Sequence, residues 1–329
     1  MKLRPLSIVV FLMIALMILS ACAPAATPAP TQPPAQPAQP AAAQPTSAPA
    51  AAKVPSFPTV APGGPAHLRL ATTTSTQDSG LLDNILPDFE KLCNCKVDVV
   101  AVGTGQAIAI GQKGDADVLL VHARKQEDQF VKDQDAKERF DVMYNDFIIL
   151  GPKDDPAKVA SAASAPDAFK AIMNAQSTFA SRGDKSGTNT KELSIWSTLG
   201  ITPTKDMAWY KALGQGMGET LTFANEQNAY TLSDRGTYLA LKDKLPNLAI
   251  VLGGNTLAEN KDKSLLNPYG VLAVNPDKHP GVQYDLAMQF AKWLTSVDEQ
   301  QKIGDYGKDK FGQSLFYPSS AEWKAAHPN

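Results

Sequence analysis

From residue 67 onward, the apolar positions follow two alternating periods. Residues 67–71 alternate between polar and apolar side chains, which predicts a strand, and residues 80–95 carry apolar side chains three and four positions apart, which predicts a helix. Residues 96–102 alternate and then become apolar, as in a buried strand; a short helix should begin at 103–106, and 116–121 predict another strand. This rhythm is typical of an α/β protein with a mostly parallel sheet covered by helices.

Two later apolar runs predict strands that connect two lobes. Residues 147–152 and 269–275 are apolar and punctuated by Gly or Pro, and a second αβ unit lies between them. The further expected elements are helices near 168–174, 188–199, 282–294 and 298–303, and a strand at 178–181. A chain that leaves one lobe, builds another and returns over two connections forms a two-lobed structure with a cleft between the lobes. We expect residues 67–147 plus 271–329 in lobe 1 and residues 148–270 in lobe 2.

Residues 1–21 predict a secretory signal peptide. Lys2 and Arg4 precede the stretch 6–19, in which the only polar residue is a serine, and this stretch is too short for a comfortable membrane span. It ends in Leu-Ser-Ala-Cys22, which resembles a bacterial lipobox. The resemblance implies cleavage before Cys22 and lipidation of that cysteine. The acyl chains would anchor the protein at a membrane surface without spanning it, at the cell surface or in the periplasm.

The composition changes sharply between Cys22 and residue 66, where Ala, Pro, Gln and Thr dominate. Thirteen of the chain's 25 prolines lie in this segment. Such a segment has almost no apolar surface to bury, so we expect a disordered or extended tether whose reach is on the order of 100 Å.

Charge and cysteine content limit the partners. Removing Lys2 and Arg4 leaves 29 basic residues against 33 acidic ones, and no basic stretch or aromatic–basic pattern suggests nucleic acid. Besides Cys22, the chain has only Cys93 and Cys95. Outside the cytoplasm this pair could oxidise, although the small ring would be strained, so a local disulfide and free thiols both remain open. No other soft ligands cluster nearby to make a metal site.

Four segments share one order: a strand end, then small hydroxyl or Gly residues, then a helix. They are residues 71–75, 102–105, 180–188 and 232–237. A helix start carries unpaired N–H groups and the positive end of the helix dipole, and a row of hydroxyls adds donors. Ser and Thr are also ordinary N-caps, so the run from Thr72 to Ser75 has two interpretations. The convergence of four such segments, two with an arginine, favours a small-oxyanion site.

Motifs for chemistry are missing. The glycines at 103 and 105 lack the third glycine of a dinucleotide fingerprint, because Ile108 occupies that place, and there is no P-loop, Gly-x-Ser-x-Gly elbow or His-Glu-x-x-His. His122 closes a strand and could reach the cleft, but no nucleophile stands beside it in the sequence. We therefore expect no enzyme activity, no cofactor and no metal.

Six motifs in order carry a family resemblance. They are Ala-Thr-Thr-Thr-Ser at 71–75, Val-Gly-Thr-Gly-Gln-Ala at 102–107, Asp-Val-Leu-Leu-Val-His-Ala at 117–123, Tyr-Asn-Asp-Phe at 144–147, Ser-Arg-Gly-Asp-x-Ser-Gly-Thr at 181–188 and Ser-Asp-Arg-Gly-Thr-Tyr at 233–238. The set resembles the TupA-type tungstate-binding proteins of ABC importers over about residues 67–320. The resemblance implies a type II periplasmic-binding-protein fold with two crossover strands, which grips a tetrahedral oxyanion between its lobes.

Carried over position by position, the resemblance implies a set of oxyanion ligands. They are Thr73, Thr74, Ser75, Thr104, Ser181, Arg182 and Arg235. Two positions depart from the family pattern: Arg124 stands where proline is common, and Asn189 where histidine is common.

The expected function is therefore a lipid-anchored, monomeric receptor that binds tungstate or molybdate and delivers it to an ABC permease. A site lined only by donors should disfavour hydrogen phosphate, which brings its own proton. The alternatives are a phosphate or sulfate receptor, in which Asp184 or Asp234 would accept that proton, a secreted phosphoryl- or acyl-transfer enzyme that uses Arg182 and Arg235, and a surface sensor.

Overall fold

The computed structural model describes residue 57 and residues 64–328, which belong to one compact unit. The predicted signal peptide, Cys22 and nearly all of the predicted tether lie outside the described residues. No helix within the described part combines the length and the apolar character that a membrane crossing requires.

The first lobe is built on three parallel strands. Strand β1 (Ala66–Thr73) lies between β2 (Cys95–Val102) and β3 (Val118–Val121), and pairs parallel with both. Helices α1 (Thr74–Asp78), α2 (Leu81–Cys93), α3 (Thr104–Gln112) and α4 (Arg124–Lys132) connect and cover these strands. The C-terminal elements are α9 (Tyr284–Thr295), α10 (Val297–Asp305), α11 (Lys308–Phe311), β10 (Tyr317–Pro318) and α12 (Ala321–Ala326).

The second lobe repeats this arrangement on shorter strands. Strand β5 (Phe179–Ser181) lies between β6 (Tyr210–Ala212) and β7 (Tyr230–Asp234), parallel to both. The remaining elements are α5 (Ala165–Asn174), α6 (Gly187–Thr198), α7 (Met217–Gln227), α8 (Arg235–Leu241), β8 (Leu248–Leu252) and the short 3-10 helices η1 (Val159–Ser161), η2 (Lys242–Lys244), η3 (Leu257–Glu259) and η4 (Lys263–Leu265).

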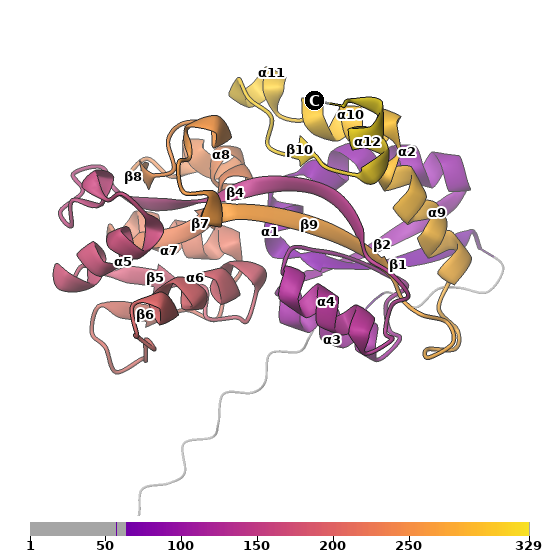
Figure 1. Cartoon of the computed structure of the whole chain (residues 1–329), viewed down its shortest axis with the longest axis horizontal. Coiled ribbons are helices and arrows are strands. Elements are labelled where there is room, and N and C mark those ends of the chain that lie inside the picture. Colours follow the sequence, from indigo (N-terminus) through magenta and orange to yellow (C-terminus); the bar gives the residue numbers. More distant parts are fainter. Residues whose placement is uncertain (1–56, 58–63, 329) are drawn as a thin grey trace, which may run out of the picture. The chain divides into compact units, whose positions relative to one another are not determined.

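Two long strands join the lobes. Strand β4 (Phe140–Pro152) pairs with β9 (Leu266–Ala273) and β10 along its first part and with β7 and β8 along its second, always antiparallel. Figure 1 shows β4 and β9 running side by side between the two lobes. The expectation of a mostly parallel sheet was therefore wrong for the sheet as a whole, because both crossover strands pair antiparallel with their neighbours. The division of the lobes at residues 147/148 and 270/271 stays a prediction.

Side chains on the two faces of the first-lobe sheet enter different cores. Along β3, Val118 and Leu120 belong to one cluster with α2 and α9, whereas Leu119 and Val121 belong to another with α3 and α4. Figure 1 accordingly shows α3 and α4 on one face and α9 on the other. A third cluster, around Trp196, fills the second lobe. The first cluster also includes residues of α7 and α8, so apolar packing continues from one lobe into the other.

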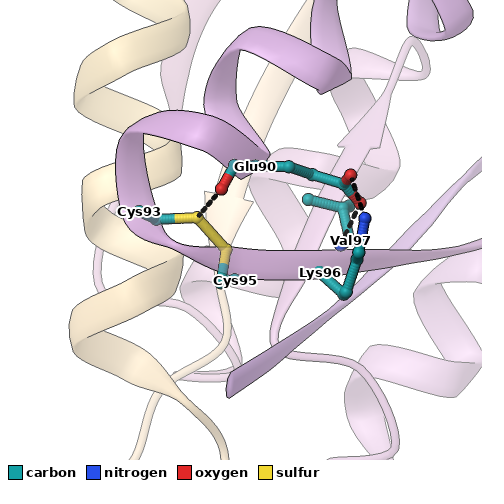
Figure 2. The surroundings of a disulfide bond; sticks show 5 residues. All are labelled: Glu90, Cys93, Cys95, Lys96 and Val97. Atoms are coloured by element: carbon teal, nitrogen blue, oxygen red, sulfur yellow. Dashed lines mark hydrogen bonds and ion pairs between the residues drawn. A yellow bond between two sulfur atoms is a disulfide. The ribbon is translucent and has the colours of Figure 1, made fainter. Parts of the chain in front are cut away.

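A disulfide joins Cys93 to Cys95 where α2 leads into β2. Asn94 between them adopts the left-handed conformation with φ 49°, which ends the helix and turns the chain into the strand. Glu90 supports this turn: its carboxylate accepts a 2.9 Å hydrogen bond from the Val97 N–H and pairs with Lys96 at 2.9 Å (Figure 2). Of the two alternatives left open by the sequence, the structure has the disulfide.

Candidate oxyanion site

The run from Thr72 to Ser75 leads from β1 directly into α1, and its four hydroxyls have different partners. Thr72 Oγ1 donates to the Leu120 carbonyl at 2.7 Å, so this hydroxyl belongs to the sheet. Thr73 is the N-cap of α1, since its Oγ1 accepts from the Thr76 N–H at 3.3 Å. Thr74 Oγ1 accepts a hydrogen bond from Arg182 of the second lobe, and Ser75 Oγ lies 3.1 Å from His122 Nε2. The capping interpretation is thus correct for Thr73. It leaves the side chains of Thr74 and Ser75 able to contact an anion.

Arg182 follows β5 and is buried, with 1% of its surface exposed. Its Nη2 donates to Thr74 Oγ1 at 2.7 Å across the lobe boundary and to Asp184 Oδ2 at 2.6 Å. Its Nε and Nη1, which carry three N–H groups, have no partner within the described residues. A buried cationic donor without an acceptor costs free energy, so Arg182 is suited to an anionic ligand.

Glycines allow the lobes to meet beside Arg182. The Gly187 N–H at the start of α6 donates to Thr104 Oγ1 at 3.0 Å, and the Gly105 N–H donates to the Lys185 carbonyl at 3.3 Å. A Cβ on Gly103 would lie 2.9 Å from the Asp184 carbonyl oxygen, and one on Gly187 would lie 3.0 Å from His122 atoms. Thr104 keeps its own hydroxyl proton for another acceptor.

The hydroxyl of Ser181, which precedes Arg182 in the chain, already has two hydrogen-bond partners. Its hydroxyl donates to Glu192 Oε2 at 2.5 Å and accepts from Asn189 Nδ2 at 3.3 Å. Burial raises the pKa of Glu192 to about 7, although Ser181, Tyr210, Asn189 and Trp196 all donate hydrogen bonds to its carboxylate. With Glu192 ionised, the single proton of Ser181 is committed to it.

Arg235 begins α8 and is also buried, but its guanidinium is occupied. Nε and Nη2 donate to the two carboxylate oxygens of Asp146 at 2.8 and 2.7 Å, and Nη2 and Nη1 donate to the carbonyls of Gly253 and Gly254, both at 2.8 Å. The structure therefore does not bring the Arg235 side chain together with the open donors of Arg182.

The two aspartates beside the arginines have separate tasks. Asp184 pairs with Arg182 and accepts from the Ser186 N–H at 3.1 Å. Asp234 caps α8, with Oδ1 accepting from the Thr237 N–H at 2.8 Å, whereas Arg235 forms its ion pair with Asp146. Burial raises the pKa of Asp234 to about 6.

His122 directly follows β3 and contacts two of the predicted ligands, which the sequence did not show. Its Nε2 lies 3.1 Å from Ser75 Oγ and 3.2 Å from Thr73 Oγ1, and its ring stacks on Tyr269 with 4.6 Å between centroids. Burial lowers the pKa of His122 to about 4, a hydrogen bond to Asn267 opposes this, and Arg182 lowers it further. The statement that no nucleophile stands beside His122 was wrong in space, because Ser75 is a hydroxyl within reach. The position of His122 at a strand end was the available signal.

The two departures from the family pattern differ in consequence. Arg124 is exposed and pairs with Asp128 at 2.6 Å, one turn along α4. Asn189 is buried, and its amide donates to Ser181 and Glu192. Only Asn189 therefore contacts residues next to Arg182.

Known proteins are similar to this chain in sequence and in fold. A model of the PBP superfamily domain matches residues 36–298. The tungstate-binding protein TupA of Peptoclostridium acidaminophilum is 48% identical over 257 residues, which cover 77% of this chain and 86% of the relative. This chain belongs to the TupA family of tungstate-binding proteins. The resemblance inferred from the sequence motifs is confirmed.

Solved structures of the TupA family agree with the architecture. The structure of the tungstate ABC transporter from Geobacter sulfurreducens is 52% identical, covers 73% of this chain and 98% of its own, and has a TM-score of 0.65. TupA from Desulfovibrio alaskensis is 40% identical, covers 78% of this chain and 99% of its own, and has a TM-score of 0.63. The predicted two-lobed α/β binding-protein fold with two crossover strands is confirmed.

Proposed function

We propose that this chain is the extracytoplasmic receptor of an ABC importer, and that it binds tungstate or molybdate and delivers it to the permease. The names of its relatives, which describe tungstate binding and transport, support this assignment. The proposal assigns no catalysis to the chain.

The observation that carries the proposal is the buried guanidinium of Arg182, with three N–H groups unpartnered in the described part of the chain. It lies where residues of both lobes meet, beside hydroxyls that still have protons to donate. We assign direct contact with the oxyanion to Arg182, Thr73, Thr74, Ser75 and Thr104. We assign a supporting role to Ser181 and Arg235, whose side chains are bound to Glu192 and Asp146.

Calorimetric titration of the protein with tungstate, molybdate, sulfate and phosphate tests this function. We expect tungstate and molybdate to bind more tightly than sulfate and phosphate. The reason for discrimination against phosphate needs revision, because the site is not lined by donors alone: Asp184 Oδ2 and His122 Nε2 are acceptors nearby. Those two acceptors favour phosphate as the second candidate, and tighter binding of phosphate than of tungstate would establish it.

A hydrolase is the candidate from another class, and one observation speaks for it. Ser75 Oγ, His122 Nε2 and Asn267 Oδ1 are in the order of a nucleophile, a base and an orienting group. Against it, Arg182 disfavours the imidazolium that such a base must become, and Asn267 brings no charge to stabilise it. Release of p-nitrophenol from an ester by the protein, lost in Ser75→Ala, would support the enzyme; we expect none.

The membrane location is part of the proposal. Lipidation of Cys22, the tether and the monomeric state rest on the sequence alone. Mass spectrometry of the protein from membranes should find Cys22 as an acylated N-terminal residue. An unmodified N-terminus that includes residues before Cys22 would contradict the anchor.

A further inference from the structure

His122 is placed to contact the oxyanion itself. It ends β3 beside Thr73, which ends the neighbouring parallel strand β1, and ligands of α/β proteins bind at such adjacent strand ends. Its Nε2 lies within 3.2 Å of the hydroxyls of Thr73 and Ser75. Gly187 of the other lobe packs on the same ring. The imidazole is therefore enclosed from both lobes.

The tautomer of His122 follows from a chain of amides. Asn267 Nδ2 donates to Asn145 Oδ1 at 2.7 Å, which leaves Asn267 Oδ1 to face His122 Nδ1 at 3.0 Å. Since Oδ1 is an acceptor, Nδ1 carries the proton of the neutral ring. Nε2 then carries a lone pair and accepts a hydrogen bond. It faces the hydroxyls of Thr73 and Ser75, which have protons to donate.

Anion binding would leave this acceptor unsatisfied. The hydroxyls of Thr73, Ser75 and Thr76 form one cluster, with Thr73 Oγ1 2.6 Å from Thr76 Oγ1 and 3.2 Å from Ser75 Oγ. When these hydroxyls turn their protons to an oxyanion, Nε2 loses its donor and is directed toward negative charge. A proton on Nε2 converts the acceptor into a charged donor without any movement of the ring.

Before an anion binds, the charges around His122 do not favour its protonation. Arg182 is the facing cation, and Asp184 offsets it only in part, with Asp234 and Asp78 also close to Arg182. Strand β4 presents the Phe147 ring at 6.4 Å, and β9 presents the neutral Tyr269 ring. Asp146 on β4 is neutralised by its own arginine. A divalent oxyanion would add two negative charges beside the ring, and these would favour a proton on Nε2.

Building on the proposed function, we propose that His122 is a further ligand of the oxyanion and binds it as the imidazolium, so that one proton from solvent enters at Nε2 with each anion. In the protein without anion, burial lowers the pKa of His122 to about 4, so the ring is neutral at pH 7. The affinity should then weaken as pH rises, by about tenfold per pH unit while uptake is complete. Asp234, with its pKa raised to about 6, is the competing acceptor of the proton.

Calorimetry in paired buffers counts the proton. Tungstate is titrated into the full chain at about pH 7 in PIPES and in imidazole, whose ionisation enthalpies differ, and the change in observed enthalpy gives the protons taken up. We expect close to one proton for the wild type, close to none for His122→Gln, and an unchanged value for Asp234→Asn. His279→Gln is the matched control, because His279 pairs with Asp135 instead.

The outcomes separate the two claims. Tungstate binding with no proton uptake overturns the role of His122 and leaves the proposed function intact. Uptake that persists in His122→Gln and disappears in Asp234→Asn also overturns it. If another of the four anions binds instead of tungstate, the proposed function fails, and the same count is made with that anion. Should His122→Gln not fold, nitrogen-15 NMR of the wild-type imidazole decides: Nε2 should gain a proton when the anion is added, and an unchanged neutral ring overturns the proposal.

Discussion

Arg182 and Arg235 follow neighbouring strands of the second lobe in nearly the same local sequence, and the structure uses them in opposite ways. Each comes directly after the end of its strand, is followed by glycine, and is at most 2% exposed. Arg235 binds both oxygens of Asp146 and two carbonyls, whereas Arg182 keeps three N–H groups unpartnered in the described part of the chain. The difference teaches that a buried arginine is suited to bind a ligand when the fold leaves some of its N–H groups without an acceptor, even though Arg182 has Asp184 as a counter-ion. Four predictions test this difference, first at the two arginines and then at the residues around them.

Removing the counter-ion of Arg235 should have the largest effect, and the effect should be on stability. Asp146→Asn leaves a buried guanidinium without its carboxylate, so we expect the free energy of unfolding to fall by ~3–5 kcal/mol. Denaturation in urea measures it. Asp128→Asn is the matched control: its pair with Arg124 is exposed, and the expected loss is ~0–1 kcal/mol. Equal losses of unfolding free energy in the two variants would show that the buried Asp146–Arg235 pair stabilises the fold no more than an exposed pair does.

Removing Arg182 should instead change affinity. Arg182→Gln takes away the buried cation, so we expect tungstate to bind roughly 100-fold more weakly, about 3 kcal/mol, while stability changes little. Calorimetry and urea denaturation of the same sample measure both. A large loss of stability with unchanged affinity would give Arg182 the role assigned to Arg235.

The hydroxyls of residues 72–75 allow the same comparison between an effect on stability and an effect on affinity, with smaller expected changes. Thr74→Ala combined with Ser75→Ala removes two proposed ligands, and we expect tungstate affinity to fall by ~1–3 kcal/mol, more than the free energy of unfolding. Thr72→Val is the control, since its hydroxyl donates to the Leu120 carbonyl: stability should fall and affinity should not. The reverse pattern would show that Thr74 and Ser75 stabilise the fold and do not bind the anion.

The last effect is a pH dependence of stability that arises from Glu192, which accepts a hydrogen bond from Ser181. Burial raises the pKa of Glu192 from 4.5 to about 7, so the folded state binds the extra proton. Its contribution to stability is present below about pH 4.5 and is lost as pH rises to about 7. Glu192→Gln should flatten the fall in unfolding free energy across that window. An identical pH profile for variant and wild type would contradict the raised pKa.

Local patterns were sufficient for the elements that the sequence analysis named, whereas the ligand set stays a prediction. The apolar period of residues 80–95 corresponds to α2, Leu81–Cys93, and the strand predicted at 178–181 ends at Ser181, as β5 does. Strand β1 continues two residues beyond the predicted end at Ala71, to Thr73. Prediction failed where the partner is distant in sequence. Asp146, which occupies Arg235, lies 89 positions away, and Asn267, which fixes the tautomer of His122, lies 145 positions away. No local period encodes such pairs, so neither the Asp146–Arg235 pair nor the Asn267–His122 contact was expected from the sequence.

The direct test of the contrast between the two arginines is a crystal structure of the tungstate complex, in which the anomalous signal of tungsten locates the anion. The expected peak lies beside Arg182 Nε and Nη1, within reach of Thr74 and Ser75, with Arg235 still bound to both oxygens of Asp146. A peak beside the Arg235 guanidinium, with the Asp146 pair broken, would contradict the assignment.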